Sequence, residues 1–381
     1  MKLNLIQTAI LLSLIPTTST FAGGLDRSGQ SISAFLQSGN YAEAGISVLD
    51  PDVQGTSSVK GFEGERISDM AEDYYFPTAA IKIQATDKIS LGLLYDQPFG
   101  ADSQYATDST TFGFGGQGTA VEVKTNNITA LIGYQPNENW NFYAGPVYQT
   151  VDAKVSLRGA AYGGPAAVGG YDISLKEEEA YGWLAGFAYS IPEIALKAAV
   201  TYRSEIKHEV ETLETFGLGT VVFPSSITDI TTPQSVNLDL QTGIAQDTLA
   251  FANIRWVHWD QFAVTPDVLK AKSNNNLIDY SDDQWSATVG LGRKFNAKWS
   301  GTAAIGWDSG AGNPVTTLGP TEGYWSVGLG GQYSPAENYF IAGGVKYFWL
   351  GDAQAQTGGK VAGNFEDNTA IGYGMKIGYR F

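Results

Sequence analysis

Charged residues alternate in one short stretch of this 381-residue chain. Within Thr201–Lys207, single uncharged residues separate Arg203, Glu205 and Lys207. In a β-strand this spacing places all three side chains on one face. A carboxylate that leaves water needs a cation or several donors, because an unpaired buried charge is costly. We therefore interpret Arg203 and Lys207 as candidate partners of a ligand carboxylate, together with Lys346 on a later strand. The alternative is that the three charges pair with one another or with other buried carboxylates.

A histidine and an aspartate are also spaced for chemistry. In Val257-His258-Trp259-Asp260, His258 and Asp260 share one strand face, and such a pair can activate water or a serine hydroxyl. Neither His258 nor His208 lies in a Gly-x-Ser-x-Gly nucleophile motif, so we predict no catalytic residue and no enzymatic activity. With two histidines and no cysteine, we also predict no metal site and no cofactor.

Composition narrows the class of protein. The chain has 23 Lys and Arg against 39 Asp and Glu, a net charge of -16, which argues against a nucleic-acid partner. Only 16% of residues are charged, whereas 46 are glycine and 12% are aromatic. Residues 1–22 read as a signal peptide, with Lys2, an apolar run over 9–15 and the cleavage site Thr20-Phe21-Ala22. The protein is therefore expected to be exported.

Alternation with a period of two predicts the elements that position these residues. At the C-terminus, apolar and aromatic residues alternate with glycine, lysine and arginine from Ile371 to Phe381. Segments of about ten residues with one apolar face and aromatic ends are typical of strands that cross an outer membrane. We predict fourteen such strands, starting near residues 41, 74, 88, 119, 139, 174, 193, 234, 247, 281, 297, 323, 338 and 367.

Short and long connections alternate between these strands, as in an outer-membrane barrel with short periplasmic turns and long outer loops. The long connections include 99–118, 153–173 and 211–233. The fold class is therefore all-β, a fourteen-stranded antiparallel transmembrane β-barrel over residues 41–381. A secreted soluble β-sandwich or propeller is the alternative, but its outward faces would be polar.

Several segments, in order along the chain, resemble the FadL family of outer-membrane transporters for long-chain fatty acids and other hydrophobic compounds. They are Leu49-Asp50-Pro51-Asp52-Val53-Gln54-Gly55, Thr201-Tyr202-Arg203-Ser204-Glu205-Ile206-Lys207, the Trp256 to Phe262 segment, Gly306-Trp307-Asp308-Ser309 and Tyr324-Trp325-Ser326-Val327-Gly328. The resemblance implies an N-terminal hatch inside the barrel, an apolar luminal pocket and lateral exit at a kink in the third strand. The family's Asn-Pro-Ala hatch signature is absent, and only residues 23–40 remain for the short luminal hatch. Its candidate residues are Gly23, Gly24, Leu25, Ile32, Phe35 and Leu36.

The third strand ends in a sequence that favours a kink. Asp96, Gln97, Pro98, Phe99 and Gly100 follow its alternating part. Proline cannot donate to the strand ladder, and glycine favours a bulge, so the pairing with a neighbouring strand is expected to open here. The alternative is that the strand simply ends in a long loop.

Aromatic residues in the outer loops form the last candidate site. Tyr105, Phe112, Phe114, Tyr162 and Tyr171 are interpreted as an exposed hydrophobic groove that captures ligand, or as residues that anchor the barrel at the headgroups.

We therefore predict passive transport of long-chain fatty acids or hydrocarbons across the bacterial outer membrane. The partners would be the hydrophobic cargo, outer-membrane lipid and lipopolysaccharide, and the family resemblance implies a monomer. The competing function is a general or polar-solute porin, which would have about sixteen to eighteen strands and a charged lumen.

Overall fold

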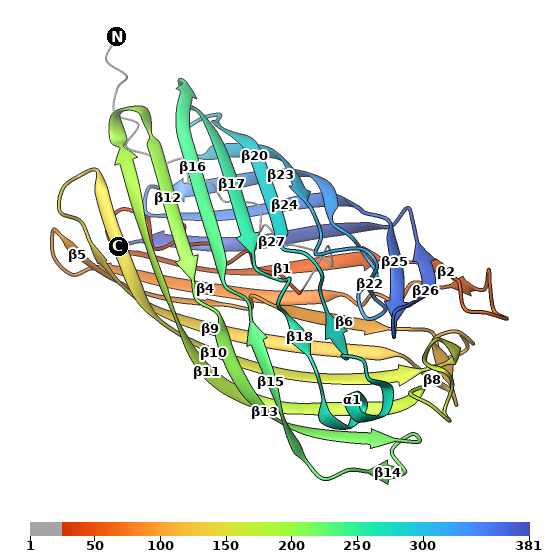
Figure 1. Cartoon of the computed structure of the whole chain (residues 1–381). Coiled ribbons are helices and arrows are strands. Elements are labelled where there is room, and N and C mark those ends of the chain that lie inside the picture. The colour runs from red at the N-terminus through yellow and green to blue at the C-terminus, as the bar shows by residue number, and fades with distance from the viewer. Residues whose placement is uncertain (1–24) are drawn as a thin grey trace.

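The chain forms a closed antiparallel β-barrel, described here from a computed structural model over residues 25–381 (Figure 1). The first strand pairs with both the second and the last, which closes the sheet. The predicted fourteen-stranded barrel is thus confirmed. The signal peptide at 1–22, Gly23 and Gly24 lie outside the described residues.

Three of the fourteen barrel strands are interrupted and consist of two segments each. In chain order the strands are β1 (Tyr41–Asp52), β4 (Tyr74–Gln84), β5 (Ile89–Asp96) with β6 (Gly100–Gln104), β9 (Ala120–Tyr134), β10 (Trp140–Arg158), β11 (Gly170–Ile191), β12 (Leu196–Arg203) with β13 (Ile206–Phe216), β15 (Ser226–Thr232) with β16 (Ser235–Ala245), β17 (Thr248–Val257), β20 (Gln284–Lys294), β21 (Trp299–Asp308), β23 (Tyr324–Ala336), β24 (Tyr339–Leu350) and β27 (Thr369–Arg380). No helix within residues 25–381 is long and apolar enough to cross a membrane.

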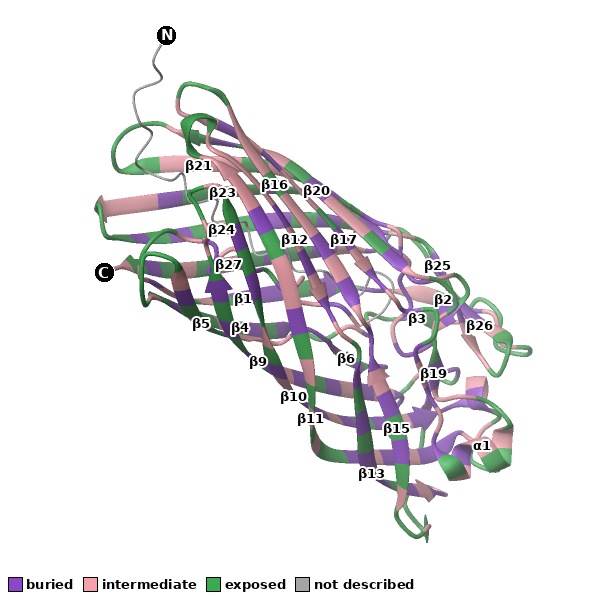
Figure 2. Ribbon diagram, turned by 60° about the vertical axis from the view of Figure 1, so that its left-hand side comes forward, coloured by how far each residue is buried: buried purple, intermediate pink, exposed green. Residues whose placement is uncertain are grey.

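Burial alternates along the strands, as Figure 2 shows. The outward side chains are largely apolar and exposed, as lipid requires. Tryptophans form a belt on the outward face near the outer loops, because Trp256 faces Trp285 and Trp325 faces both Trp307 and Trp349 across the strand pairs. Such belts mark the level of the lipid headgroups.

The connections at the outer end are structured. They contain a five-stranded sheet, two two-stranded sheets, a short strand that pairs with β13, a helix and a 3-10 turn, which gather at the end of the barrel opposite the C-terminus (Figure 1). These elements are β2 (Gly55–Ser57), β3 (Arg66–Ile67), β22 (Val315–Thr316), β25 (Ala353–Thr357), β26 (Lys360–Phe365), β7 (Gly113–Phe114), β8 (Gln117–Gly118), β18 (Ala263–Val264), β19 (Ile278–Asp279), β14 (Val221–Val222), α1 (Asp267–Ser273) and η1 (Ala160–Tyr162).

Two of the predicted long loops are partly strand. β10 has 19 residues and β11 has 22, about twice the length that a tilted strand needs to cross a bilayer. The extra residues of β10 and β11 continue their ladder above the membrane into the region 153–173. In the region 211–233, β13 and β15 pair with each other in the same way. The boundaries of those loops were therefore wrong, since alternation in sequence does not report where lipid ends.

Candidate functional site

The third barrel strand is broken between β5 and β6. β5 pairs with β4 on one side and β9 on the other, but β6 pairs with β9 and has no ladder with β4. The last facing pair between β4 and β5 is Ala79 with Tyr95, so Tyr74–Thr78 has no ladder partner in the third strand. The opening coincides with the predicted kink, Asp96–Gly100, because the chain turns inward at Gln97–Phe99.

A side chain bridges this opening in place of the main-chain ladder. The Tyr74 hydroxyl donates to the Asp102 carbonyl at 2.8 Å and accepts from the Asp102 N–H at 2.8 Å. The Arg27 guanidinium lies 3.7 Å from the centroid of the Tyr74 ring. A buried phenol therefore spans the gap at this level, with an arginine of the N-terminal segment stacked on it. Beyond it, the Gln104 N–H donates to the Met70 carbonyl at 2.8 Å and joins the outer end of the gap.

The N-terminal segment also bonds directly to the broken strand. The Gly100 N–H donates to the Leu25 carbonyl at 2.9 Å, and the Arg27 N–H donates to the Pro98 carbonyl at 2.7 Å. The Ser28 hydroxyl donates to the Asp96 carboxylate at 2.5 Å. Residues 25–28 thus take part of the place that β4 leaves vacant.

Charged side chains of the barrel wall hold the rest of this segment, residues 25–40, which we call the hatch. Arg255 on β17 forms a fully buried ion pair with Asp26 at 2.6 Å. Arg203 on β12 donates to the Gln30 carbonyl at 2.6 Å, and Lys197 donates to the Leu36 carbonyl at 2.7 Å. Lys82 on β4 donates to the Gln37 carbonyl.

Apolar packing holds the hatch as well. Ile32, Phe35 and Leu36 are buried among Leu131, Tyr143 and Leu184 of the wall. The Phe35 ring meets the Tyr143 ring edge to face at 5.8 Å. The predicted hatch residues from Leu25 onward therefore contact the lumen wall. The sequence did not reveal Arg255, Lys82 and Lys197 as anchors of the hatch. The only signal was that each alternates with apolar outward residues along its strand and so faces the lumen.

The candidate carboxylate partners lie in different environments. Arg203 is buried, but it already serves the hatch. The structure contradicts the expectation that Glu205 and Lys207 share its face. Ser204 and Glu205 interrupt the strand and reverse the alternation, so Lys207 is exposed and pairs with Asp229 at 2.9 Å.

Lys346 is the candidate that remains in the lumen. Its side chain on β24 is buried, and its ammonium lies 4.7 Å from the centroid of the Phe348 ring and 5.3 Å from that of Tyr324. Within residues 25–381 no hydrogen-bond acceptor reaches its Nζ atom. A buried ammonium in this state is suited to an anionic group.

The aromatic residues predicted as an exposed groove are mostly buried. Tyr105, Phe112, Tyr162 and Tyr171 belong to an apolar core that fills the outer end of the barrel, and only Phe114 is exposed. The rings of Tyr105 and Phe112 lie 4.3 Å apart. The prediction of an open groove at these four residues was wrong, because the strand extensions give loop aromatics a core in which to pack.

An outer cavity of about 480 Å³ nevertheless opens between the loops. Tyr162 and Leu269 line its apolar side, and Asn275, Gln356 and Lys360 line its polar side. The His258 and Asp260 side chains lie 3.2 Å apart on the outer rim, beside Asp283. They are close, as the sequence predicts, but they do not share a strand face, because β17 ends at Val257.

An outward apolar surface, an aromatic belt and a plugged lumen define this molecule as an outer-membrane β-barrel. A model of the family described as outer membrane protein transport protein (OMPP1/FadL/TodX) matches residues 31–381. The chain therefore belongs to the FadL/TodX family of passive outer-membrane channels for hydrophobic compounds. A comparison with curated proteins found no match.

Solved structures share the fold at low sequence identity. A Pseudomonas aeruginosa FadL homologue has a TM-score of 0.71 at 14% identity, over 92% of each chain. The Pseudomonas putida toluene transporter TodX has a TM-score of 0.63 at 14% identity, over 91% of each chain. The Ralstonia pickettii toluene transporter TbuX has a TM-score of 0.62 at 12% identity, over 96% of each chain.

Proposed function

We propose that this protein takes up long-chain fatty acids or hydrocarbons and releases them sideways into the outer membrane between β4 and the broken third strand. The observation that carries the proposal is the loss of the ladder over Tyr74–Thr78. An apolar cargo that leaves by this route avoids the periplasmic water, which is where its transfer would be least favourable.

A small cavity beside the opening supports this route. It measures about 120 Å³ and lies between the hatch and the wall. Its lining includes Ser28 of the hatch, Thr78 and Ala79 of β4, and Leu94 and Asp96 of β5. A space between the hatch and the strands that border the opening supports a lateral exit at this place.

Cargo would enter from the outer loops. The outer cavity beside Tyr162 and the exposed ring of Phe114 are the capture surfaces, in place of the full groove expected from the sequence. The protein would work as a monomer surrounded by outer-membrane lipid and lipopolysaccharide.

Lys346 would recognise the carboxylate when the cargo is a fatty acid. Of the three candidates it alone is buried in the lumen without an acceptor among the described residues. A hydrogen bond to a charged group is worth roughly 1.5–3 kcal/mol, so one contact is enough to distinguish an acid from an alkane.

The test compares binding of a long-chain fatty acid and of the alkane of equal length to the detergent-purified barrel. We expect the acid to bind more tightly, Lys346→Met to remove this preference without changing alkane binding, and the exposed control Lys207→Met to retain it. Equal binding of both ligands would make the lumen a hydrocarbon site and Lys346 a structural residue. If neither binds, the proposal fails and the porin alternative gains support.

A further inference from the structure

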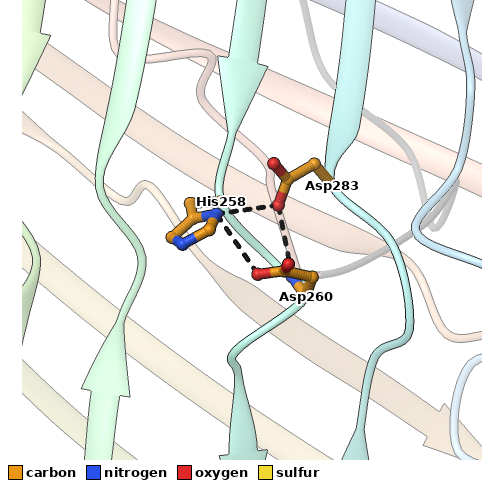
Figure 3. A group of neighbouring side chains, drawn as sticks. All are labelled: His258, Asp260 and Asp283. Atoms are coloured by element: carbon orange, nitrogen blue, oxygen red, sulfur yellow. Dashed lines mark hydrogen bonds and ion pairs between the residues drawn. The ribbon is translucent and has the colours of Figure 1, made fainter.

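His258, Asp260 and Asp283 converge on the outer surface of the barrel (Figure 3). β17 ends at Val257 and β20 begins at Gln284, and these two residues form the last facing pair of their ladder. His258 and Asp283 are therefore the first residues beyond these strand ends on the extracellular side, and Asp260 lies two residues after His258. The three side chains come from two chain segments that the barrel ladder brings together.

The cluster lies on the outward face, just above the tryptophan belt. Trp256 faces the exposed Trp285, and alternation places His258 on the same side as Trp256. Trp259, between His258 and Asp260, points inward and is fully buried. The His258 side chain is 18% exposed and Asp260 43%, so an ion in the aqueous headgroup layer has access to both.

The distances fit a divalent transition-metal ion. His258 Nδ1 lies 2.9 Å from Asp283 Oδ1 and 3.2 Å from Asp260 Oδ1, and all three donor atoms lie within 4.8 Å of one another. Donors at the Zn–N and Zn–O bond lengths of about 2.0–2.2 Å around a tetrahedral ion are themselves about 3.3 Å apart. A small adjustment therefore admits the ion.

The Trp256 side chain fixes one of these candidate metal ligands, the Asp283 carboxylate. The Trp256 indole N–H donates to Asp283 Oδ2 at 2.8 Å, and Asp283 Oδ1 faces the imidazole and the Asp260 N–H. The Trp256 and His258 rings lie 5.3 Å apart, which restricts the imidazole. Partners of this kind orient metal ligands and raise metal affinity.

The donor set also selects among metals. One imidazole nitrogen with two carboxylate oxygens suits Zn²⁺ and similar ions, whereas Mg²⁺ and Ca²⁺ prefer six or more oxygen ligands. Two carboxylates and a neutral imidazole balance the charge of a divalent cation. The remaining position is left for water.

We propose that His258, Asp260 and Asp283 form a Zn²⁺-class metal site at the outer rim of the barrel. The proposal departs from the sequence-based expectation of no metal site, because Asp283 lies far from the other two in sequence. It does not depend on the cargo or on the route of transport.

The test uses the full-length mature protein without a histidine tag, stripped with chelator and titrated with ZnCl₂ by calorimetry. We expect one Zn²⁺ per chain, with Mg²⁺ and Ca²⁺ at least about tenfold weaker. His258→Ala should abolish the binding. Trp256→Phe, which keeps a ring but loses the indole donor, should weaken it by about tenfold.

Trp285→Phe is the matched control, because it changes the facing residue of the belt without touching the cluster, and its Zn²⁺ affinity should be unchanged. A thermal unfolding scan without metal shows whether each variant is folded. Absence of saturable Zn²⁺ binding, or unchanged binding in folded His258→Ala, would overturn the proposal. Equal affinity for Ca²⁺ would also overturn it, since that result indicates a nonspecific acidic surface.

Discussion

The wall of this barrel differs between two regions. From β20 through β21, β23, β24 and β27 to β1, every strand pairs with its neighbours over most of its length. Beside β4, the third strand is broken, and a tyrosine and the hatch replace the ladder. Continuous main-chain bonding closes the wall on one side, whereas side-chain contacts and the hatch close it at the gap, and the proposed lateral exit lies at this second kind of boundary.

The largest expected effect comes from a covalent cross-link across the gap, which would prevent the broken part of the wall from opening. Ala71 and Ser103 form an isolated antiparallel bridge at the outer end of the gap, and such pairs have Cα atoms about 4.5–5.5 Å apart, which suits a disulfide. In oxidised Ala71→Cys/Ser103→Cys, uptake of hydrophobic cargo by cells should fall to the level without the protein, and reductant should restore it.

The chain has no native cysteine, so the bridge is the only disulfide. Ile305→Cys/Val327→Cys, a facing pair in the continuous wall, is the control and should transport normally. Normal transport by the oxidised first pair would contradict lateral exit at the gap.

The second prediction concerns the hatch. Asp26→Asn leaves the buried Arg255 charge without its carboxylate, and removal of one partner of such a pair costs about 3–5 kcal/mol. We expect faster hydrogen exchange over residues 25–37 and a higher single-channel conductance. Asp229→Asn, in an exposed ion pair, should change neither quantity. If the hatch amides remain equally protected in Asp26→Asn, the ion pair does not anchor the hatch.

Removal of the Tyr74 hydroxyl should weaken the closure of the gap and leave the continuous part of the wall unchanged. Tyr74→Phe loses both hydrogen bonds to Asp102, an effect of about 1–3 kcal/mol. The Asp102 amide should exchange faster, and cargo uptake should increase. The neighbouring Tyr75 points to lipid, so Tyr75→Phe serves as the control and should behave like the wild type. Slower uptake in Tyr74→Phe would mean that the phenol guides the cargo instead of closing the gap.

The smallest effect is expected in the loop between β21 and β23, on the continuous side. Burial raises the pKa of Glu322 from its usual value of 4.5 to about 7, although the Gly312 N–H donates to this carboxyl at 3.1 Å. The folded state therefore binds the proton more tightly than the unfolded state. This stabilisation is complete below about pH 4.5 and is lost as the pH rises through 7.

Thermal unfolding in detergent between pH 4 and 8 tests this assignment. Glu322→Gln should be more stable than the wild type at pH 8, and the difference should disappear at low pH. A difference that does not change with pH would rule out Glu322 as the titrating group.

The strand count was predictable because an apolar outward face repeats a period of two in every crossing segment. That period carries no information about interruptions, so Ser204 and Glu205 reversed the side on which Lys207 lies. The kink was visible locally in Pro98 and Gly100. The ion pair that anchors the hatch was not, because Asp26 and Arg255 are 229 residues apart and each alone looks like an ordinary charge.

The hydroxyl of Tyr74 has a consequence for how this wall can change over generations. A ladder of main-chain bonds is common to all residue types, so few substitutions alter it. The two bonds across the gap between Tyr74 and Asp102 depend on one side chain, so a single substitution can remove them while the ladders on either side stay in place. Under the proposed lateral exit, mutation could therefore change the ease of opening separately from the stability of the barrel.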